Sequence, residues 1–426
     1  YIKELGITHI QLLPVADFAT VDEFYPMYHY NWGYDPLQYG VPEGSFSSNP
    51  NDPYARVIEF RKLVNAFHAN GIMVIMDVVF NHMYDIKASM MENCCPYYFF
   101  RYDENKELSN GSFCGNDFDS TMYMARKHIL DMLKRWMVFY GVDGFRFDLM
   151  GILDIDTMNQ VSELVKSIKP YGMVYGEGWN MPTALDNDMK AMIYNHGKMK
   201  DIAFFNDRFR DYLKGRTGDY DKMDQGFLTG DLSMTAAMTS GMTGSCLARY
   251  GSYFDDPNKS INYVECHDNA TLWDKMAECC ANESEETRKK RQKMINAAIL
   301  FAQGVPFLHA GQEFLVTKGG NTNSYNAPDN INGIDWIRRA KENDVVEFTK
   351  LCIEIRKEYA GFRLASAEEI EQKVAVNFLN GIVLSYEIDH DDKVIKHARV
   401  LFNPTNADIH VELGAEWLEI LDERGR

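Results

Sequence analysis

The first 365 residues alternate between short apolar runs and longer segments whose apolar residues recur at helical spacing. Seven runs predict buried strands, because nearly every residue in them is hydrophobic, as in a parallel sheet covered on both faces. These runs lie near residues 8, 73, 144, 173, 203, 262 and 306. Between them the pattern predicts helices, for example at about 123–140, where Ile129, Leu133 and Trp136 share one face.

After residue 365 the pattern changes to short alternating segments at 374–378, 382–388, 398–402 and 409–413, with turns between them. This pattern predicts an all-β region over residues 366–426, part of a β-sandwich. Seven strand–helix units in residues 1–365 predict an α/β fold, a (β/α)8 TIM-type barrel with long βα loops. On this count the first barrel strand is missing from the chain. A doubly wound open sheet is the rival, but no Gly-rich turn follows the first strand.

Composition narrows the classes of function. The 426 residues carry a net charge of −18, which argues against binding nucleic acid or an anionic membrane surface. No apolar run reaches the ~18 residues of a membrane-spanning helix. A neutral substrate is compatible with this charge.

The eight cysteines include two adjacent pairs, Cys94–Cys95 and Cys279–Cys280, and show neither a zinc-site spacing nor a secreted disulfide framework. We therefore expect reduced thiols and a cytoplasmic location. An extracellular location would require a signal peptide upstream of Tyr1. Both ends look cut from a longer protein, and a barrel short of one strand exposes its edges. We thus expect the isolated chain to be unstable or poorly active.

Polar residues follow four of the predicted strands. They are Asp77 to His82, Arg146 with Asp148, Glu177 to Trp179, and His267-Asp268-Asn269. In a βα barrel the C-terminal strand ends face one mouth, where active sites lie. Each ending by itself has a simpler explanation, such as an ion pair or a helix cap. Four together predict an active site with three carboxylates.

Three carboxylates suit the hydrolysis of a glycosidic bond, which needs a nucleophile and a proton donor. Arg146 beside Asp148 favours its ionised form, so Asp148 is the predicted nucleophile. Glu177 next to the apolar ring of Trp179 is the predicted general acid and base. Asp268 is expected to hold sugar hydroxyls in the transition state. The remaining candidate sugar contacts are the donors His82 and His267, the stacking rings Tyr34, Trp179 and Trp273, and Leu149 at the strand end.

The four motifs, Asp77-Val-Val-Phe-Asn-His82, Gly144-Phe-Arg-Phe-Asp148, Glu177-Gly-Trp179 and Val264-Glu-Cys-His-Asp-Asn269, resemble the four sequence regions of the α-amylase superfamily, glycoside hydrolase family 13. The loop Tyr30-Asn-Trp-Gly-Tyr-Asp-Pro36 looks like the marker of its type I pullulanases. The resemblance covers roughly residues 1 to 360. It implies retaining hydrolysis of α-1,6 branch linkages in α-glucans such as pullulan, glycogen or starch limit dextrins.

By position the resemblance assigns Asp148 as nucleophile, Glu177 as acid/base and Asp268 as transition-state stabiliser. It adds Asp329 and Asn269 to the candidate substrate contacts and gives Arg146 a role beside the reacting sugar. It implies no required cofactor and no metal in the catalytic site. A structural Ca²⁺ is compatible with the family, but the sequence assigns no ligands to it.

Other functions stay open on the sequence. Isoamylase, α-1,4-amylase or branching activities belong to the same superfamily, and the Asn31 to Pro36 loop favours debranching over them. A non-catalytic glucan-binding barrel would be expected to lack a carboxylate, yet all three are present. A metal-dependent hydrolase using His82 and His267 is disfavoured, because the paired histidine spacings of such sites are absent.

Overall fold

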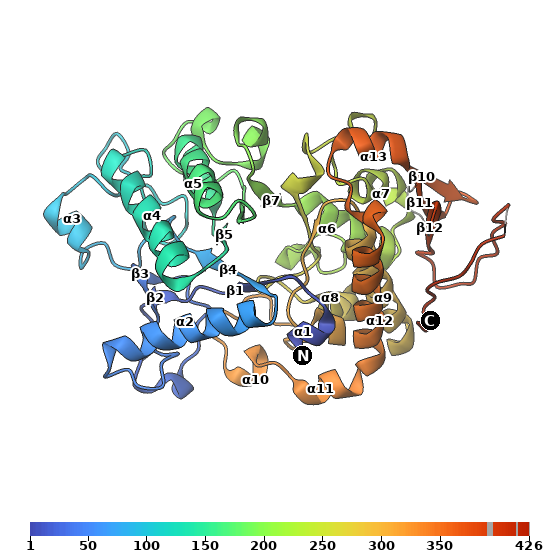
Figure 1. Cartoon of the computed structure of the whole chain (residues 1–426), viewed down its shortest axis with the longest axis horizontal. Coiled ribbons are helices and arrows are strands. Elements are labelled where there is room, and N and C mark those ends of the chain that lie inside the picture. The colour runs from blue at the N-terminus through green and yellow to red at the C-terminus, as the bar shows by residue number, and fades with distance from the viewer. Residues whose placement is uncertain (390–394, 415, 426) are drawn as a thin grey trace. The chain divides into compact units, whose positions relative to one another are not determined.

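The structure is a computed structural model, and it describes residues 1–389, 395–414 and 416–425 (Figure 1). By their internal contacts these residues form two compact units. The N-terminal unit comprises Ile7–Phe205 and Tyr325–Pro328. The C-terminal unit comprises Tyr1–Gly6, Asn206–Ser324 and Asp329–Arg426. The predicted boundary between residues 365 and 366 stays a prediction.

The N-terminal unit is built on five parallel strands that pair in chain order, each with the next. They are β1 (His9–Leu12), β4 (Met73–Val78), β5 (Gly144–Phe147), β6 (Met173–Gly176) and β7 (Ala203–Phe205). All four residues of β5 are buried. Phe145 and Phe147 alternate with the charged Arg146 along this strand, so one face of the strand buries aromatic rings and the other buries a guanidinium. The predicted strands of this unit are confirmed.

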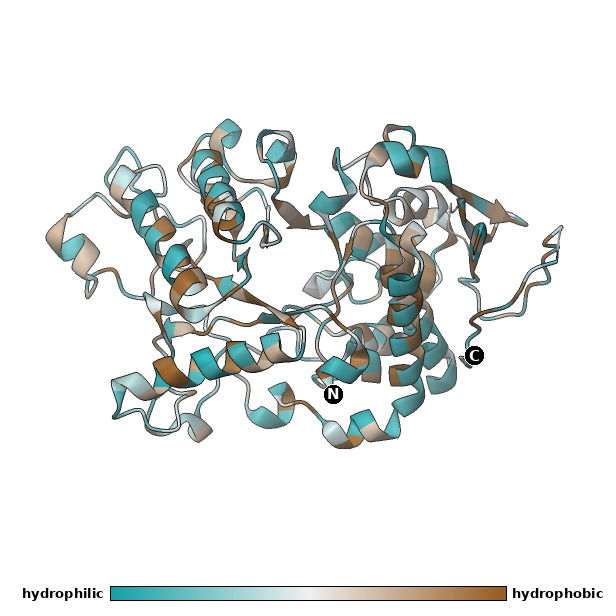
Figure 2. Ribbon diagram, in the orientation of Figure 1, coloured by the Kyte–Doolittle hydropathy of each residue, from teal (hydrophilic) through white to brown (hydrophobic). Residues whose placement is uncertain are grey.

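The helices of this unit are α2 (Pro53–Ala69), α3 (Met90–Cys94), α4 (Tyr123–Arg135) and α5 (Ile155–Ile168). Asp52 caps α2 by accepting a hydrogen bond from the Tyr54 backbone N–H, and Pro53 occupies the first turn. Gly141 has a positive φ of 88° where the chain turns from the helical segment after α4 towards β5. Hydrophilic and hydrophobic residues alternate along α2, whose buried residues include Phe60 and Val64 (Figure 2).

Two features of this unit were not expected from the sequence. The Tyr30 to Pro36 segment, expected as a loop, lies between two strands that pair in antiparallel fashion, β2 (Ala16–Phe18) and β3 (Pro36–Pro42). The long 84–122 section, also expected as a loop, contains the short helix α3. The elements β2 and α3 are too short for a periodic hydrophobic pattern, and β3 contains two prolines and a glycine, which are typical of turns.

The C-terminal unit contains the parallel strands β8 (Ser260–Asn262) and β9 (Val305–Pro306), which confirm the last two predicted barrel strands. Its helices are α1 (Ile2–Leu5), α6 (Asp207–Lys214), α7 (Thr235–Met242), α8 (Leu272–Cys279), α9 (Glu285–Phe301), α10 (Asp329–Asn332), α11 (Trp336–Lys341), α12 (Asn343–Glu358) and α13 (Ala367–Lys373). Helices α9 and α12 pack against each other.

An antiparallel sheet of β10 (Val374–Leu379), β11 (Val383–Asp389) and β12 (His397–Phe402) follows, as predicted. The predicted strand at 409–413 is wrong. Among the described residues this segment has no ladder partner, and its carbonyl groups accept side-chain hydrogen bonds instead. Asn380 donates to His410 and Arg399 donates to Leu413. An alternating pattern marks a face that could be buried, but a strand also needs a neighbouring backbone to pair with.

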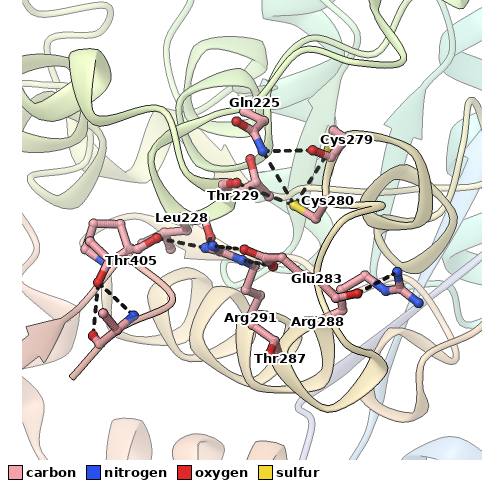
Figure 3. Close-up of polar contacts among 12 residues, drawn as sticks. Gln225, Leu228, Thr229, Cys279, Cys280, Glu283, Thr287, Arg288, Arg291 and Thr405 are labelled. Carbon is pink, nitrogen blue, oxygen red and sulfur yellow. Dashed lines mark hydrogen bonds and ion pairs between the residues drawn. The ribbon is translucent and has the colours of Figure 1, made fainter.

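Arg291 ties the helices of the C-terminal unit to the segment that follows β12 (Figure 3). Its guanidinium forms a two-pronged ion pair with Glu283, with both distances 2.6 Å. One terminal nitrogen also donates to the carbonyl oxygens of Leu228 at 2.8 Å and Pro404 at 2.9 Å. The side chain is buried, so these contacts replace water for both charged groups.

Candidate active site

The C-terminal ends of the parallel strands β4, β5 and β6 bring the predicted motifs of the N-terminal unit together. Asp77 pairs in register with Arg146 on the neighbouring strand, and Arg146 pairs with Tyr175 on the next. Parallel strands that are adjacent in a sheet end on the same edge. Consequently Asp77, Asp148 and Glu177, which lie 71 and 29 residues apart in the chain, become neighbours.

Arg146 is the centre of this cluster. Its Nη1 lies 3.0 Å from Asp77 Oδ1 and 2.9 Å from Asp148 Oδ1, and its Nη2 lies 2.9 Å from Glu177 Oε1. The Arg146 side chain is 2% exposed. Burial opposes the charged guanidinium, but the surrounding carboxyl groups raise its pKa further, so the group stays cationic. One fixed positive charge therefore faces three carboxyl groups.

The pKa values of these carboxyl groups follow from that imbalance. Burial raises the pKa of Asp77 to about 8, the charge of Asp148 adds to the rise, and Arg146 only partly offsets both. The pKa of Glu177 is also raised, mainly by burial and then by Asp148. If all three carboxyl groups were ionised, they and the single buried guanidinium would together carry a net charge of −2. With its pKa of about 8, Asp77 keeps a proton at neutral pH, and the raised pKa of Glu177 favours the protonated form that a general acid requires.

Two side chains outside the predicted list join this cluster. Asn81 Nδ2 donates to Asp148 Oδ2 at 2.7 Å and to the Asp148 backbone carbonyl at 2.9 Å. Asn81 Oδ1 lies 2.5 Å from His82 Nδ1. Asp77 accepts a 2.7 Å hydrogen bond from the Tyr34 hydroxyl, besides its contact with Arg146. Both residues stand in the strand-end motif from Asp77 to His82, and that position was the available signal for them.

The predicted residues His82, Tyr34 and Leu149 lie in the same cluster. His82 is 3% exposed, and burial lowers its pKa to about 4, so its ring is neutral near pH 7. The Arg146 guanidinium lies 5.7 Å from the centroid of the Tyr34 ring. The Leu149 backbone N–H donates to Glu177 Oε2 at 3.1 Å. Leu149 has a positive φ of 39°, so the chain turns sharply as it leaves β5.

Trp179 affects Glu177 differently from the sequence expectation. The predicted rise of the Glu177 pKa is present, but its cause is overall burial and the charge of Asp148. Hydrogen bonding from the Leu149 backbone and the Trp179 side chain lowers the pKa of Glu177 and offsets part of the rise. The Trp179 indole therefore acts on the carboxyl group as a polar partner.

The remaining predicted carboxylate, Asp268, lies in the C-terminal unit on the turn that follows β8. His267 Nε2 is 3.6 Å from Asp268 Oδ2, and the Asp268 side chain is 44% exposed. Asn269, the next residue, has a positive φ of 64°. This turn thus presents an accessible carboxylate beside a buried histidine, on a strained backbone that needs support.

Lys318, which sequence reasoning missed, supplies that support. Its ammonium group donates to the His267 backbone carbonyl at 2.8 Å and is buried. The Lys318 backbone N–H donates to Asp274 Oδ2 at 2.8 Å, and the Thr317 hydroxyl bonds the other Asp274 oxygen. The 317–318 segment thereby links the 267–269 turn to the first turn of α8. No motif marks Lys318, because it lies 51 residues from its partner.

Two further predicted contacts lie in the C-terminal unit. Trp273, in α8, has the guanidinium groups of Arg288 and Arg338 each 5.7 Å from its ring centroid. A sugar stacking on this ring would compete with these cations for its faces. Asp329 is the exposed first residue of α10. Their roles as substrate contacts stay predictions.

One group of acids among the described residues could hold a cation. Asp17, Glu23 and Glu43 lie close together in the N-terminal unit. Arg56 already occupies their surroundings, 2.5 Å from Glu23 and 3.6 Å from Asp17. Glu43 accepts backbone hydrogen bonds from Phe18 and Ser45. None of these residues belongs to the predicted catalytic set, and a structural Ca²⁺, which the family allows, has no assigned ligands.

Comparison with known proteins agrees with this geometry. The family described as alpha amylase, catalytic domain, matches residues 1–95. A pullulanase of Bacillus subtilis (strain 168) is 45% identical over 395 residues, which cover 92% of this chain and 55% of the relative. The chain belongs to the pullulanases of the α-amylase superfamily. Chloroplastic pullulanase 1 of Arabidopsis thaliana is 31% identical over 78% of this chain.

Solved pullulanase structures confirm the predicted fold, a (β/α) barrel followed by a β region. Type I pullulanase from Bacillus subtilis str. 168, complexed with maltose, superposes with a TM-score of 0.97 at 42% identity, over 100% of this chain and 60% of that one. A pullulanase from Anoxybacillus sp. LM18-11, complexed with maltotetraose, gives 0.92 at 45% identity over 95% and 59%. The chain therefore spans a little more than half the length of these relatives.

The described helices include none that is both long and apolar enough to cross a membrane. Among the described cysteines no disulfide is formed.

Proposed function

We propose that this protein is a retaining glycoside hydrolase that cleaves α-1,6 branch linkages in pullulan, glycogen or starch limit dextrins. The observation that carries the proposal is the contact of one buried guanidinium, Arg146, with Asp77, Asp148 and Glu177. This arrangement keeps two carboxyl groups adjacent but chemically different. A retaining hydrolase needs such a pair, one ionised to attack and one protonated to release the leaving group.

Asp148 is the nucleophile. Arg146 and Asn81 each donate to a different oxygen of its carboxylate, which favours the ionised form and fixes its orientation. Asp148 attacks the anomeric carbon, the bond to the leaving oxygen breaks, and a covalent glycosyl ester forms. Water then cleaves this ester with retention of configuration.

Glu177 is the general acid and then the general base. Because its pKa is raised, the Glu177 carboxyl group favours the protonated form and donates its proton to the leaving oxygen in the first step. The resulting carboxylate takes a proton from water in the second step. Its position is set by Arg146 on one oxygen and the Leu149 backbone N–H on the other. Asp77 does not react in this scheme; it holds Arg146 and Tyr34 in place.

The other assignments rest on residue type and on position in the motifs. Asp268 stabilises the positive charge that develops on the sugar in the transition state. His82, His267, Asn269 and Asp329 contact the substrate, and Tyr34, Trp179 and Trp273 offer rings to it. The reaction needs no cofactor and no metal ion, so dialysis against EDTA should leave the rate unchanged.

The names of the relatives support the α-1,6 preference, as does the Asn31 to Pro36 loop. Structures of relatives with maltose, maltotetraose or maltotriose support an α-glucan as the partner. The cysteines support a reducing compartment, for which we propose the cytoplasm.

Product analysis on pullulan tests the proposal. Maltotriose is expected, since it results only from cleavage of the α-1,6 bonds. Panose or isopanose would instead identify an α-1,4 hydrolase of the same superfamily, and no product would favour a non-catalytic glucan-binding barrel. Asp148→Asn is expected to lower the rate at least a thousandfold, and near-full activity in that variant would refute the nucleophile assignment.

A further inference from the structure

A cavity of about 340 Å³ lies in the C-terminal unit, beside the β10–β11–β12 sheet. Its walls come from the sheet, from the end of α13, from residues 249–250 and from Trp417. None of the residues that line it belongs to the candidate active site described above. The volume is within the range of ligand-binding pockets, roughly 300–1,000 Å³.

Basic and acidic residues line this cavity in equal number. The basic residues are Arg249, Lys373 and His397, and the acidic residues are Glu371, Glu387 and Asp389. Each acid has a basic partner within ion-pair distance. Arg249 lies 2.8 Å from Glu371, Arg399 lies 3.2 Å from Glu387, and His397 contacts Asp389. A matched lining attracts neither anions nor cations strongly, so it favours a neutral ligand with many hydrogen-bonding groups.

Two aromatic rings line the same cavity. Trp417 is 37% exposed, and the Arg399 guanidinium lies 4.5 Å from its ring centroid. The Tyr250 ring has the Arg249 guanidinium 4.7 Å from its centroid. The guanidinium competes with a sugar for one face of each ring, as at Trp273, but it also restricts the motion of the ring, so less conformational entropy is lost when a sugar stacks on the opposite face. Rigid aromatic rings beside paired polar groups suit a sugar, which has apolar faces and a polar rim.

We propose that this cavity is a second binding site for an α-glucan chain, separate from the residues that cleave it. Tyr250 and Trp417 contact the sugar rings, and the paired groups, such as Glu371 with Arg249, bond the hydroxyls. The ligand class rests on the proposed function, because a polymeric substrate offers many sugar units to one protein. A second site then raises the effective concentration of branch points near the active site.

Affinity electrophoresis in gels containing glycogen tests the proposal. The full chain should carry Asp148→Asn in every sample, so that the polymer is not degraded during the run. Replacing both rings, Tyr250→Ala with Trp417→Ala, is expected to raise the apparent Kd for glycogen about tenfold. Leu418→Ala is the matched control, since Leu418 is 86% exposed, follows Trp417 and does not line the cavity. Its Kd should stay within twofold.

Kinetics with otherwise unmodified protein complete the test. The double replacement should leave kcat/KM on a short branched oligosaccharide unchanged and lower kcat/KM on glycogen. If the double variant proves unfolded at the assay temperature, the single variants Tyr250→Ala and Trp417→Phe test the site instead, since each changes only one of the two rings. The expected results are a higher Kd with Tyr250→Ala and a smaller change with Trp417→Phe.

A Kd for glycogen within twofold of the parent after both rings are replaced would overturn the second site. An equal loss in Leu418→Ala would overturn it too, because the effect would then follow from general disturbance of the 417–418 segment. Failure of the proposed function looks different. The parent without Asp148→Asn would then leave pullulan uncleaved, whereas retardation in glycogen would still depend on Trp417 and Tyr250.

Discussion

Asn81 offers the sharpest test of how the proposed nucleophile, Asp148, is held. It is fully buried, and its amide donates to the Asp148 carboxylate at 2.7 Å and to the Asp148 backbone carbonyl at 2.9 Å. Its carbonyl oxygen contacts His82, which fixes the amide orientation. Asn81→Ala removes both donors and leaves the Arg146 contact in place. The variant therefore separates the contribution of Asn81 to this carboxylate from that of Arg146.

The size of the effect on the rate follows from the lost hydrogen bond to the Asp148 carboxylate. A hydrogen bond to a charged acceptor contributes about 1.5–3 kcal/mol. Since about 1.4 kcal/mol corresponds to tenfold in rate, kcat/KM should fall roughly 10- to 150-fold. The same loss favours the protonated form of Asp148, so the acid limb of the pH profile should move up by about one to two units.

The assay is the release of reducing ends from pullulan between pH 4 and 9. Asn116→Ala is the matched control, because Asn116 is also a buried asparagine of the N-terminal unit but bonds the Met83 backbone. It is expected to lower the melting temperature without moving the acid limb. Asn81→Asp, which sets a carboxyl group against Asp148, should be slower than Asn81→Ala at neutral pH.

Two results would show that the reasoning is wrong. One is an Asn81→Ala rate within twofold of the parent. The other is a lower rate with an unmoved acid limb, which would mean that Asn81 maintains the fold and does not tune the Asp148 charge.

Three further predictions concern other parts of the molecule. The pKa of Glu177 is raised and the general acid must be protonated, so activity should persist above the usual pH range of a carboxyl group and fall as pH rises through that pKa. Glu177→Gln should lose this alkaline limb of the pH profile along with most of the rate, and an unchanged limb would contradict the assignment. Lys318→Met should lower kcat roughly tenfold with KM within twofold, and Lys318→Arg should recover part of the lost kcat. An unchanged kcat in Lys318→Met would show that Lys318 does not affect the reaction. Arg291→Leu leaves the largely buried Glu283 carboxylate without its cation and should lower the free energy of unfolding in urea by about 3–5 kcal/mol. The control Lys290→Leu, at an exposed neighbouring residue, should lower it by less than ~0.5 kcal/mol. Equal unfolding midpoints for the two variants would refute the role of Arg291.

The strands of the barrel could be predicted from sequence because burial on both faces leaves a continuous apolar signature. The seven predicted positions all hold parallel strands, from His9–Leu12 to Val305–Pro306. The β10–β12 sheet could be predicted as well, through alternation and turn residues. The segment at 409–413 could not, because alternation is a local property, whereas strand pairing depends on a distant backbone.

The sequence by itself determined which carboxyl groups could carry the proposed chemistry. Asp148, Glu177 and Asp268 stand at the ends of apolar strands, and the direction of a parallel strand fixes the edge to which its last residues belong. Only the tertiary structure decided which other groups contact these residues. Asp77 and Asn81 reach Arg146 and Asp148 across 69 and 67 residues of chain, and Lys318 reaches His267 across 51. Hydrogen bonding depends on a few tenths of an ångström between such distant residues, and no periodic pattern along the sequence encodes that.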